Sequence, residues 1–174
     1  MKNVMRALGA AGVGVLAVGA LVVPAGSAGA AGDSVTPACG NADLEVGYRA
    51  ADAAMSHRYG RIVLTNVSDH ACSTGGYGGL SYVGGGDGTQ VGAAADRDGG
   101  KVTTFVLEPG EKAASRVDET VAGVYPKRKC RPTAVDGFRV YVPNATASQF
   151  VKHRTTGCRN ADVHLIAHRP FHHR

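Results

Sequence analysis

The chain has 174 residues, a formal net charge of +5 and a sequence pI of about 9.2, and only 6% of its residues are aromatic. This length suits one domain and excludes a large multidomain protein. Tryptophan is absent, so a hydrophobic core must be built mainly from small aliphatic side chains.

The first thirty residues have the pattern of a secretory signal peptide. Lys2 and Arg6 precede an uncharged apolar run at 7–23, and an A-x-A cleavage sequence follows at 28–30. A retained membrane anchor is the alternative, but a run of this length falls short of the roughly 20 residues that span a bilayer. We expect cleavage near Ala30 and a protein that is secreted, either extracellular or loosely associated with the cell wall.

The rest of the chain predicts one domain with short flanking segments. Residues 31–38 predict a flexible N-terminal linker, residues 39–168 a β-sandwich domain, and residues 169–174 a basic tail that contains histidine. Because no second long apolar segment follows the first, we expect no transmembrane segment in the mature chain. We expect the domain to be a monomer.

Apolar and polar residues alternate with a period of two along most of this domain, and helical periodicity is nearly absent. Turn sequences rich in Gly, or containing Pro-Gly, separate the alternating segments at 84–88, 98–100 and 108–111. The pattern predicts an all-β fold, an antiparallel β-sandwich of about eight or nine short strands. The expected strands lie around 44–48, 61–66, 80–82, 90–95, 102–107, 113–117, 138–142, 149–153 and 163–167.

Four cysteines, Cys39, Cys72, Cys130 and Cys158, follow the signal peptide, and an even number in an exported chain indicates two disulfides. Their wide spacing lacks the C-x-x-C pairs of a zinc site. The stretches CGNADLEV, from Cys39, and CRNADVHL, from Cys158, begin alike. This likeness, with a count of strand reversals, suggests that the first and last strands are parallel neighbours. We therefore prefer the pairing Cys39–Cys158 and Cys72–Cys130 over the two other connectivities.

Basic residues are concentrated in the C-terminal third. Residues 31–126 carry 7 basic and 12 acidic side chains, whereas residues 127–174 carry 10 basic and 2 acidic ones. This asymmetry suggests a basic surface. A sandwich that interleaves early and late strands would instead dilute the charge in space, and the sequence leaves both interpretations open.

The densest basic run is PKRKCRP at 126–132. Its prolines and its cysteine predict a rigid, exposed loop in which Lys127, Arg128, Lys129 and Arg131 are candidates for binding an anionic partner. No aromatic residue lies between these charges, so we do not expect nucleic-acid binding.

Several short motifs, taken in order, are similar to those of a known family. They are Cys39 with Ala42-Asp43-Leu44, Leu64-Thr65-Asn66-Val67-Ser68 before Cys72 and Gly76-Tyr77, Leu107-Glu108-Pro109-Gly110 with Ala113, and Cys130 before Phe138-Arg139-Val140 and Pro143. Over roughly residues 39–168 the chain resembles the actinobacterial secreted family catalogued as domain of unknown function 4232. The resemblance implies an immunoglobulin-like β-sandwich in an exported or lipid-anchored protein. One departure is Gly78, where the family pattern has Pro. The family has no assigned chemistry, so the resemblance implies no catalytic residue.

No motif indicates catalysis. Gly-x-Ser-x-Gly and His-Glu-x-x-His are absent, and we interpret Asp118 and Glu119 as solvated turn residues. We interpret the seven histidines as solvated rather than metal-binding; they are His57, His70, His153, His164, His168, His172 and His173. We expect no enzymatic activity, no cofactor and no metal site.

Two functions fit these observations. The first is a binding or structural module of the cell envelope, in which the basic loop and tail hold the protein on anionic wall or membrane-surface polymers. The alternative is a secreted inhibitor of trypsin-like proteases, which would present the Lys127–Arg131 loop to the protease. The sequence does not identify the physiological ligand.

Overall fold

The alternating segments form the strands of the structure, a computed structural model that describes residues 35–174. The predicted signal peptide and the first four residues of the predicted linker lie outside the described residues. Residues 35–174 form twelve strands and two helical segments, η1 (Ala122–Val124) and α1 (Lys127–Cys130). Each helical segment is about one turn long, far short of a membrane span.

The larger sheet has the strand order β1-β2-β8-β11-β6, and β12 also pairs with β8. Every pair in it is antiparallel except β11 with β6. Its strands are β1 (Leu44–Ala54), β2 (His57–Asn66), β6 (Asp96–Arg97), β8 (Lys112–Thr120), β11 (Ile166–His168) and β12 (His172–His173). The predicted C-terminal tail is therefore joined to the sheet, because β12 lies within it and pairs with Ala113 and Ala114.

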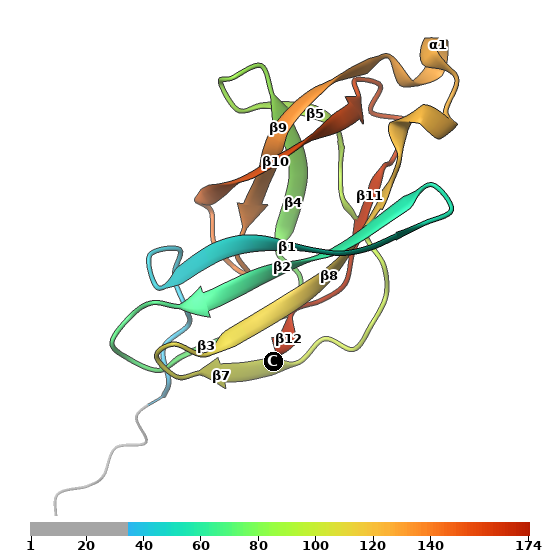
Figure 1. Ribbon diagram of the computed structural model, residues 1–174. Coiled ribbons are helices and arrows are strands. Elements are labelled where there is room, and N and C mark those ends of the chain that lie inside the picture. The colour runs from blue at the N-terminus through green and yellow to red at the C-terminus, as the bar shows by residue number, and fades with distance from the viewer. Residues whose placement is uncertain (1–34) are drawn as a thin grey trace, which may run out of the picture. The chain divides into compact units, whose positions relative to one another are not determined.

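The second sheet has four antiparallel strands in the order β10-β9-β4-β5. They are β4 (Gly79–Gly84), β5 (Thr89–Ala94), β9 (Pro132–Tyr141) and β10 (Ser148–Cys158), and a separate pair consists of β3 (Cys72–Gly75) and β7 (Thr104–Leu107). Figure 1 shows β9 and β10 crossing the upper part of the molecule and β1, β2 and β8 the lower part. In the tight turn between β4 and β5, Gly85, Gly86 and Gly88 have φ between 75° and 77°, a left-handed conformation that favours glycine.

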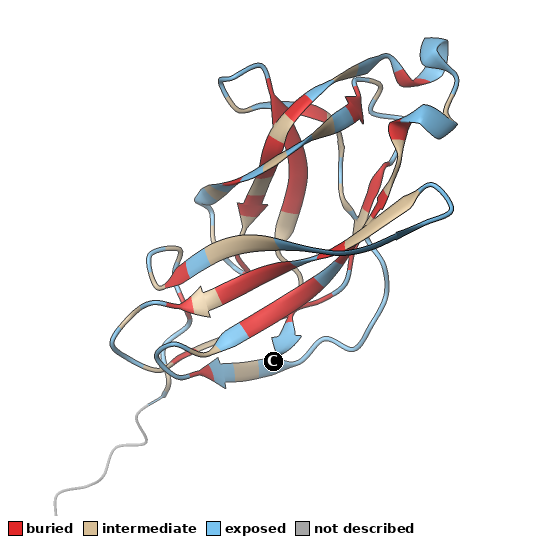
Figure 2. Ribbon diagram, in the orientation of Figure 1, coloured by how far each residue is buried: buried red, intermediate tan, exposed pale blue. Residues whose placement is uncertain are grey.

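One hydrophobic core joins the two sheets. Leu64 and Val117 from the six-stranded sheet and Phe138 and Val140 from the four-stranded sheet belong to a single buried cluster. The buried segments of both sheets appear in red in Figure 2. This packing confirms the predicted fold class, an all-β sandwich with two disulfides, but residues 35–174 form twelve strands where about eight or nine were expected, because short strands such as β3, β6 and β12 show no clear alternation.

Gln149 of β10 closes one edge of the sandwich. Its side-chain oxygen accepts a hydrogen bond from the Val46 amide, and its side-chain nitrogen donates to the carbonyl oxygens of Leu44 and Asn41, at distances of 2.6–3.1 Å. Both Val46 and Leu44 belong to β1, the outermost strand of the other sheet. One side chain thus satisfies backbone groups of an otherwise open sheet edge.

The prediction that the first and last strands are parallel neighbours is wrong. In the sheet order, β2 and β8 separate β1 from β11, and the three successive antiparallel pairings make β1 and β11 run in opposite directions. The count of strand reversals failed because Cys72 begins a strand, β3, which pairs with β7 outside both large sheets. Sequence periodicity did not distinguish this strand from a loop.

The predicted disulfide pairing is also wrong. The bonds are Cys39–Cys72 and Cys130–Cys158, which close loops of 33 and 28 residues. The second bond follows from strand pairing, because β9 and β10 are consecutive and their register places Cys158 opposite Pro132, two positions after Cys130. Each bond therefore closes a loop between segments that are near in sequence.

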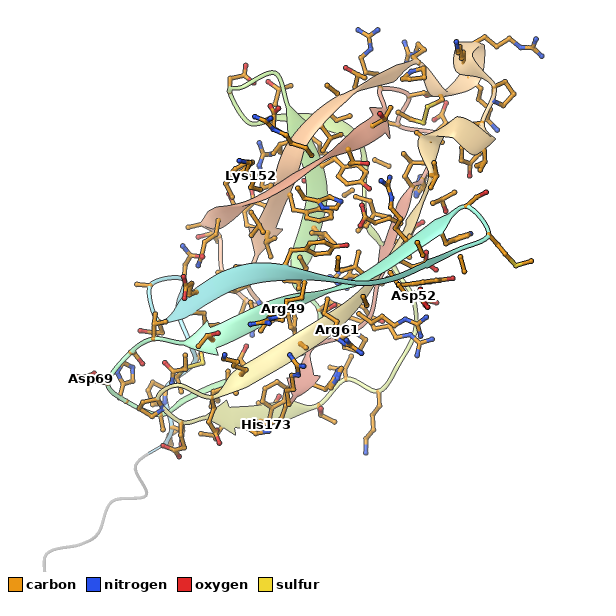
Figure 3. The ribbon with its side chains drawn as sticks, in the orientation of Figure 1. Arg49, Asp52, Arg61, Asp69, Lys152 and His173 are labelled. Atoms are coloured by element: carbon orange, nitrogen blue, oxygen red, sulfur yellow. A yellow bond between two sulfur atoms is a disulfide. The ribbon has the colours of Figure 1, made fainter. Side chains whose placement is uncertain are left out.

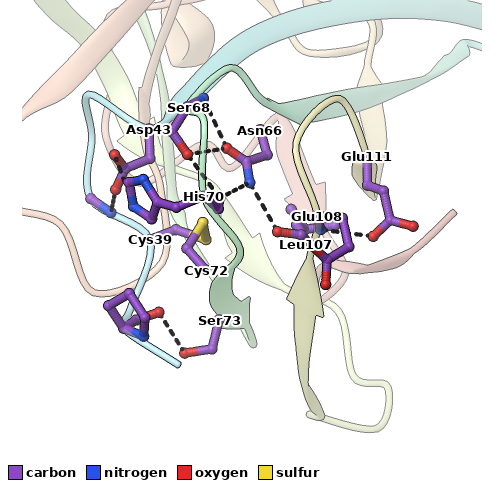
Figure 4. Close-up of a disulfide and its surroundings, with 12 residues drawn as sticks. Cys39, Asp43, Asn66, Ser68, His70, Cys72, Ser73, Leu107, Glu108 and Glu111 are labelled. Atoms are coloured by element: carbon purple, nitrogen blue, oxygen red, sulfur yellow. Dashed lines mark hydrogen bonds and ion pairs between the residues drawn. A yellow bond between two sulfur atoms is a disulfide. The ribbon is translucent and has the colours of Figure 1, made fainter. Parts of the chain in front are cut away.

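Figure 4 shows the surroundings of the first bond. The Cys39 amide donates to the Ser73 carbonyl at 2.9 Å, and the Ser73 amide donates to the Pro37 carbonyl at 2.7 Å. The buried Asn66 side chain donates to the carbonyl oxygens of His70 and Leu107, both at 2.9 Å. These hydrogen bonds tie the end of the predicted linker and the 66–72 turn to β3 and β7, so the linker is paired at its C-terminal end.

Candidate anion-binding surface

The predicted basic loop forms the single helical turn α1. The Arg131 amide donates to the Lys127 carbonyl at 2.8 Å, and Arg131 ends the turn in a left-handed conformation with φ of 51°. Cys130 is fully buried and disulfide-bonded to Cys158, so the turn is anchored at its C-terminal end. Lys127, Arg128 and Lys129 are all exposed, as the sequence predicted.

A second segment adds a further cation at this end of the molecule. The Arg159 amide donates to the Arg131 carbonyl at 3.1 Å, and the Asn160 amide donates to the Cys130 carbonyl at 3.3 Å. The side chains of Arg131 and Arg159 are both exposed. The structure therefore brings together the four predicted loop residues and Arg159, which the sequence analysis did not single out.

The basic residues of the C-terminal third are not diluted among early strands. Of the 10 basic residues in 127–174, two, Arg169 and Arg174, lie with the six-stranded sheet. The other eight lie on α1, on the β9–β10 hairpin or directly beside them, and we call them the basic surface: Lys127, Arg128, Lys129, Arg131, Arg139, Lys152, Arg154 and Arg159. Because β9 and β10 are consecutive, pair with each other and lie at one edge of their sheet, no strand from the acidic part of the chain separates them.

The basic surface has few carboxylates near it. Asp136 lies on β9, but its carboxylate accepts a hydrogen bond from the Gly86 amide at 2.9 Å. Among residues 35–174, no carboxylate oxygen lies within 4.0 Å of a charged nitrogen of any of the eight side chains. Lys129 instead lies over the Tyr125 ring, 5.9 Å from its centroid. Seven of these eight side chains are exposed and available to an anionic partner, whereas Arg139 is half-buried and donates to the Gly88 carbonyl oxygen.

A groove of about 500 Å³ lies along β10. Lys152, which is labelled in Figure 3, and Arg154 line it, together with the Phe150 side chain and the glycine-rich β4–β5 turn. Phe150 is 60% exposed, and its ring lies over Gly137, where an added Cβ would come within 2.6 Å of the ring. The groove therefore combines an exposed aromatic ring with two cations and one carboxylate, Asp136.

The interior holds a buried carboxylate that the sequence analysis misassigned. Glu119 is 0% exposed and lies in β8, so the interpretation of this residue as a solvated turn residue is wrong. Its carboxylate accepts hydrogen bonds from the Tyr82 hydroxyl and from the Tyr48 hydroxyl at 2.9 Å, and it lies 2.9 Å from Nε2 of His153. His153 in turn stacks on Phe138, with ring centroids 4.6 Å apart.

Opposing effects act on the Glu119 carboxyl. Burial alone raises its pKa, but hydrogen bonds from His153, Tyr82 and Tyr48 outweigh burial and hold the pKa below its usual value. Burial, followed by the nearby Glu119 charge, raises the pKa of both tyrosines. The donors come from β1, β4 and β10, so the ionised carboxylate connects four strands across the two sheets. Glu119 lies two positions after Val117 and four after Ser115, both buried, so it points to the same inward face of β8. This alternation could have revealed that Glu119 is buried.

Five of the seven histidines lie beside carboxylates, and His70, His164 and His173 among them are also exposed to solvent, as expected from the sequence. The pairs are His57–Asp118, His70–Asp69, His153–Glu119, His164–Asp96 and His173–Glu111, at 2.7–3.1 Å. His168 is buried, with Nδ1 3.2 Å from the Ser115 hydroxyl oxygen. Within residues 35–174, no group of three or more His, Cys, Asp or Glu side chains is arranged to hold a metal ion.

Comparison with known proteins identifies a family but no solved relative. The model of the family described as Domain of unknown function (DUF4232) matches residues 39–172, which include both disulfides, the basic surface and the Glu119 cluster. No curated protein and no solved structure matches the chain. The chain belongs to the family described as Domain of unknown function (DUF4232).

Proposed function

We propose that this protein is a secreted, non-enzymatic binding module that attaches to anionic polymers of the cell wall through its basic surface. The observation that carries the proposal is the grouping of eight basic residues on α1, the β9–β10 hairpin and Arg159, without a carboxylate partner among residues 35–174. Two disulfides favour an oxidising compartment, in agreement with the signal-peptide pattern at 1–30.

The expected attachment is weak and sensitive to salt. A Lys or Arg near an anionic surface contributes about 1 kcal/mol, so four that engage at once contribute roughly 4 kcal/mol. This corresponds to a dissociation constant of about 1 mM for one molecule. Many closely spaced anionic groups on one polymer would raise retention, because a released molecule rebinds nearby.

The geometry favours polymer binding over protease inhibition. Proteases bind segments in an extended conformation, whereas Lys127–Cys130 is a helical turn held by a buried disulfide. No contact of α1 holds the Lys127–Arg131 segment in the extended conformation that a protease inhibitor presents. Incubation with trypsin separates the two functions, because stoichiometric inhibition would support the protease alternative.

The test measures retention of the intact protein on purified cell-wall preparations at low salt and at 0.5 M salt, where the screening length is about 4 Å. We expect most of the protein to be released at high salt. Lys127→Gln/Arg128→Gln should lower retention at low salt several-fold. Lys101→Gln/Arg174→Gln, a control with the same loss of charge at exposed positions away from the basic surface, should change it little. Retention that is unaffected by salt, or equal losses in both variants, would refute the proposal.

A further inference from the structure

The outer face of the six-stranded sheet carries three arginines at directly opposed positions. Arg49 of β1 lies opposite Arg61 of β2, and Arg61 lies opposite Arg116 of β8. Directly opposed residues point to the same face of a sheet, and all three side chains are exposed. Figure 3 labels Arg49 and Arg61 on their neighbouring strands. We call these three residues the arginine row.

The arginine row concentrates positive charge without neutralising it. Neighbouring strands are only about 4.8 Å apart, and like charges directly opposite each other destabilise a sheet. Among residues 35–174, no carboxylate oxygen lies within 4.0 Å of the guanidinium groups of Arg49, Arg61 or Arg116. Asp118, two positions along β8 from Arg116, instead lies 2.7 Å from Nδ1 of His57. A bound anion would remove the repulsion.

A groove of about 420 Å³ lies beside the row. Arg49 and Lys112 line it with Gly47 and Val63, which lie opposite each other in the register. A Cβ added at Gly47 would meet no atom within 4 Å, so there is open space above this part of the sheet. Glu45 adds one carboxylate to the lining. The groove therefore has an uncharged floor bordered by one cation from β1 and one from β8, and Arg61 of β2 lies opposite Arg49.

We propose that the arginine row and this groove form a second anion-binding site, which takes a linear phosphate-bearing polymer. Each guanidinium can donate two parallel hydrogen bonds to one phosphate group. The row spans about 10 Å across three strands, so it engages successive groups of a chain rather than one ion. The guanidinium of Arg116 lies 5.1 Å from the Tyr59 ring centroid, a contact that orients it.

This site is separate from the basic surface. The arginine row lies on β1, β2 and β8 of the six-stranded sheet, whereas the basic surface lies on α1 and on β9 and β10 of the other sheet. Loss of binding at one site therefore leaves the other intact, and the inference does not rest on wall attachment.

The test titrates the intact protein with a short inorganic polyphosphate chain by calorimetry at low salt. Arg61→Gln removes the central guanidinium and should weaken binding about tenfold, the loss expected for one charge-assisted contact. Lys101→Gln, with the same loss of charge at an exposed position in the loop between β6 and β7, should weaken it less than about twofold, because only screened long-range attraction is lost.

A second measurement separates lost binding from lost folding. Arg61→Gln relieves repulsion within the sheet, so its melting temperature without ligand should be no lower than that of the wild type. Polyphosphate should raise the melting temperature of the wild type more than that of Arg61→Gln, by an amount that corresponds to the tenfold weaker binding. Amide resonances of Gly47 and Val63 should shift during the wild-type titration.

Three outcomes would overturn the inference. Equal weakening by Arg61→Gln and Lys101→Gln would show attraction to net charge alone. Poly-glutamate of matched length that binds as tightly as polyphosphate would refute the phosphate assignment. Resonance shifts confined to α1 and β10 would place the ligand on the basic surface instead.

Discussion

Replacing Glu119 by leucine tests whether the buried carboxylate stabilises the contact between the two sheets. The carboxylate is fully buried and accepts hydrogen bonds from Tyr82 and Tyr48, and it also lies 2.9 Å from His153. Leucine has a similar volume but no acceptor, so the change removes every one of these interactions and leaves the partners in place.

The expected destabilisation is about 2 kcal/mol. A buried hydrogen-bonding group left without a partner costs about 1–3 kcal/mol. Tyr82 is only 2% exposed and bears this cost in full, whereas Tyr48 and His153 are partly exposed and recover some of it from water. The three together lose roughly 4 kcal/mol, and burial of the leucine side chain offsets about 2 kcal/mol. The net loss is a large part of the 5–15 kcal/mol typical of a whole domain.

Urea unfolding at pH 7 gives the free energy of unfolding of the wild type and of Glu119→Leu. Glu45→Leu is the control, because Glu45 is an exposed glutamate of the same sheet and its replacement should change stability by no more than about 0.5 kcal/mol.

The folded-state pKa of Glu119 is lowered, so the contribution of its charge is present above the unfolded pKa and is lost as the pH falls through the folded pKa. The difference between wild type and variant should therefore shrink at acid pH. A Glu119→Leu variant as stable as the wild type at pH 7 would refute this reasoning.

Other predictions concern pH and the disulfides. Burial, with the nearby Arg97 charge, lowers the pKa of His168 from 6.5 to about 4, so the unfolded state binds more protons than the folded state between these values. Wild-type stability should fall by about 3 kcal/mol as the pH drops from above 6.5 to about 4, and a His168→Gln variant in chemical denaturation should lack this fall. Replacing Cys130 and Cys158 together by alanine should cost roughly 3 to 4 kcal/mol in guanidinium unfolding, because the bond closes a 28-residue loop. Non-reducing peptide mapping should link Cys39 to Cys72, whereas a peptide that links Cys39 to Cys158 would contradict the fold described above.

The basic loop could be predicted from sequence because its determinants are local. Two prolines, a cysteine and a run of cations specify an exposed, constrained segment whatever surrounds it, and α1 confirms this. Arg159 could not be assigned to the same surface, because its approach to Arg131 depends on the pairing of β9 with β10.

The sequence by itself determined most of the longer strands and their two faces, because alternation with a period of two depends only on backbone geometry, but it missed the short strands β3, β6 and β12. It also determined that two disulfides form, from the number of cysteines and the exported character of the pattern. Only the tertiary structure decided which strands are neighbours, and with them the cysteine pairs, the arginine row and the hydrogen-bond partners of Glu119. The physical reason is that the choice among possible strand pairings depends on how distant segments pack into one core, and the pattern within a single strand carries no record of that choice.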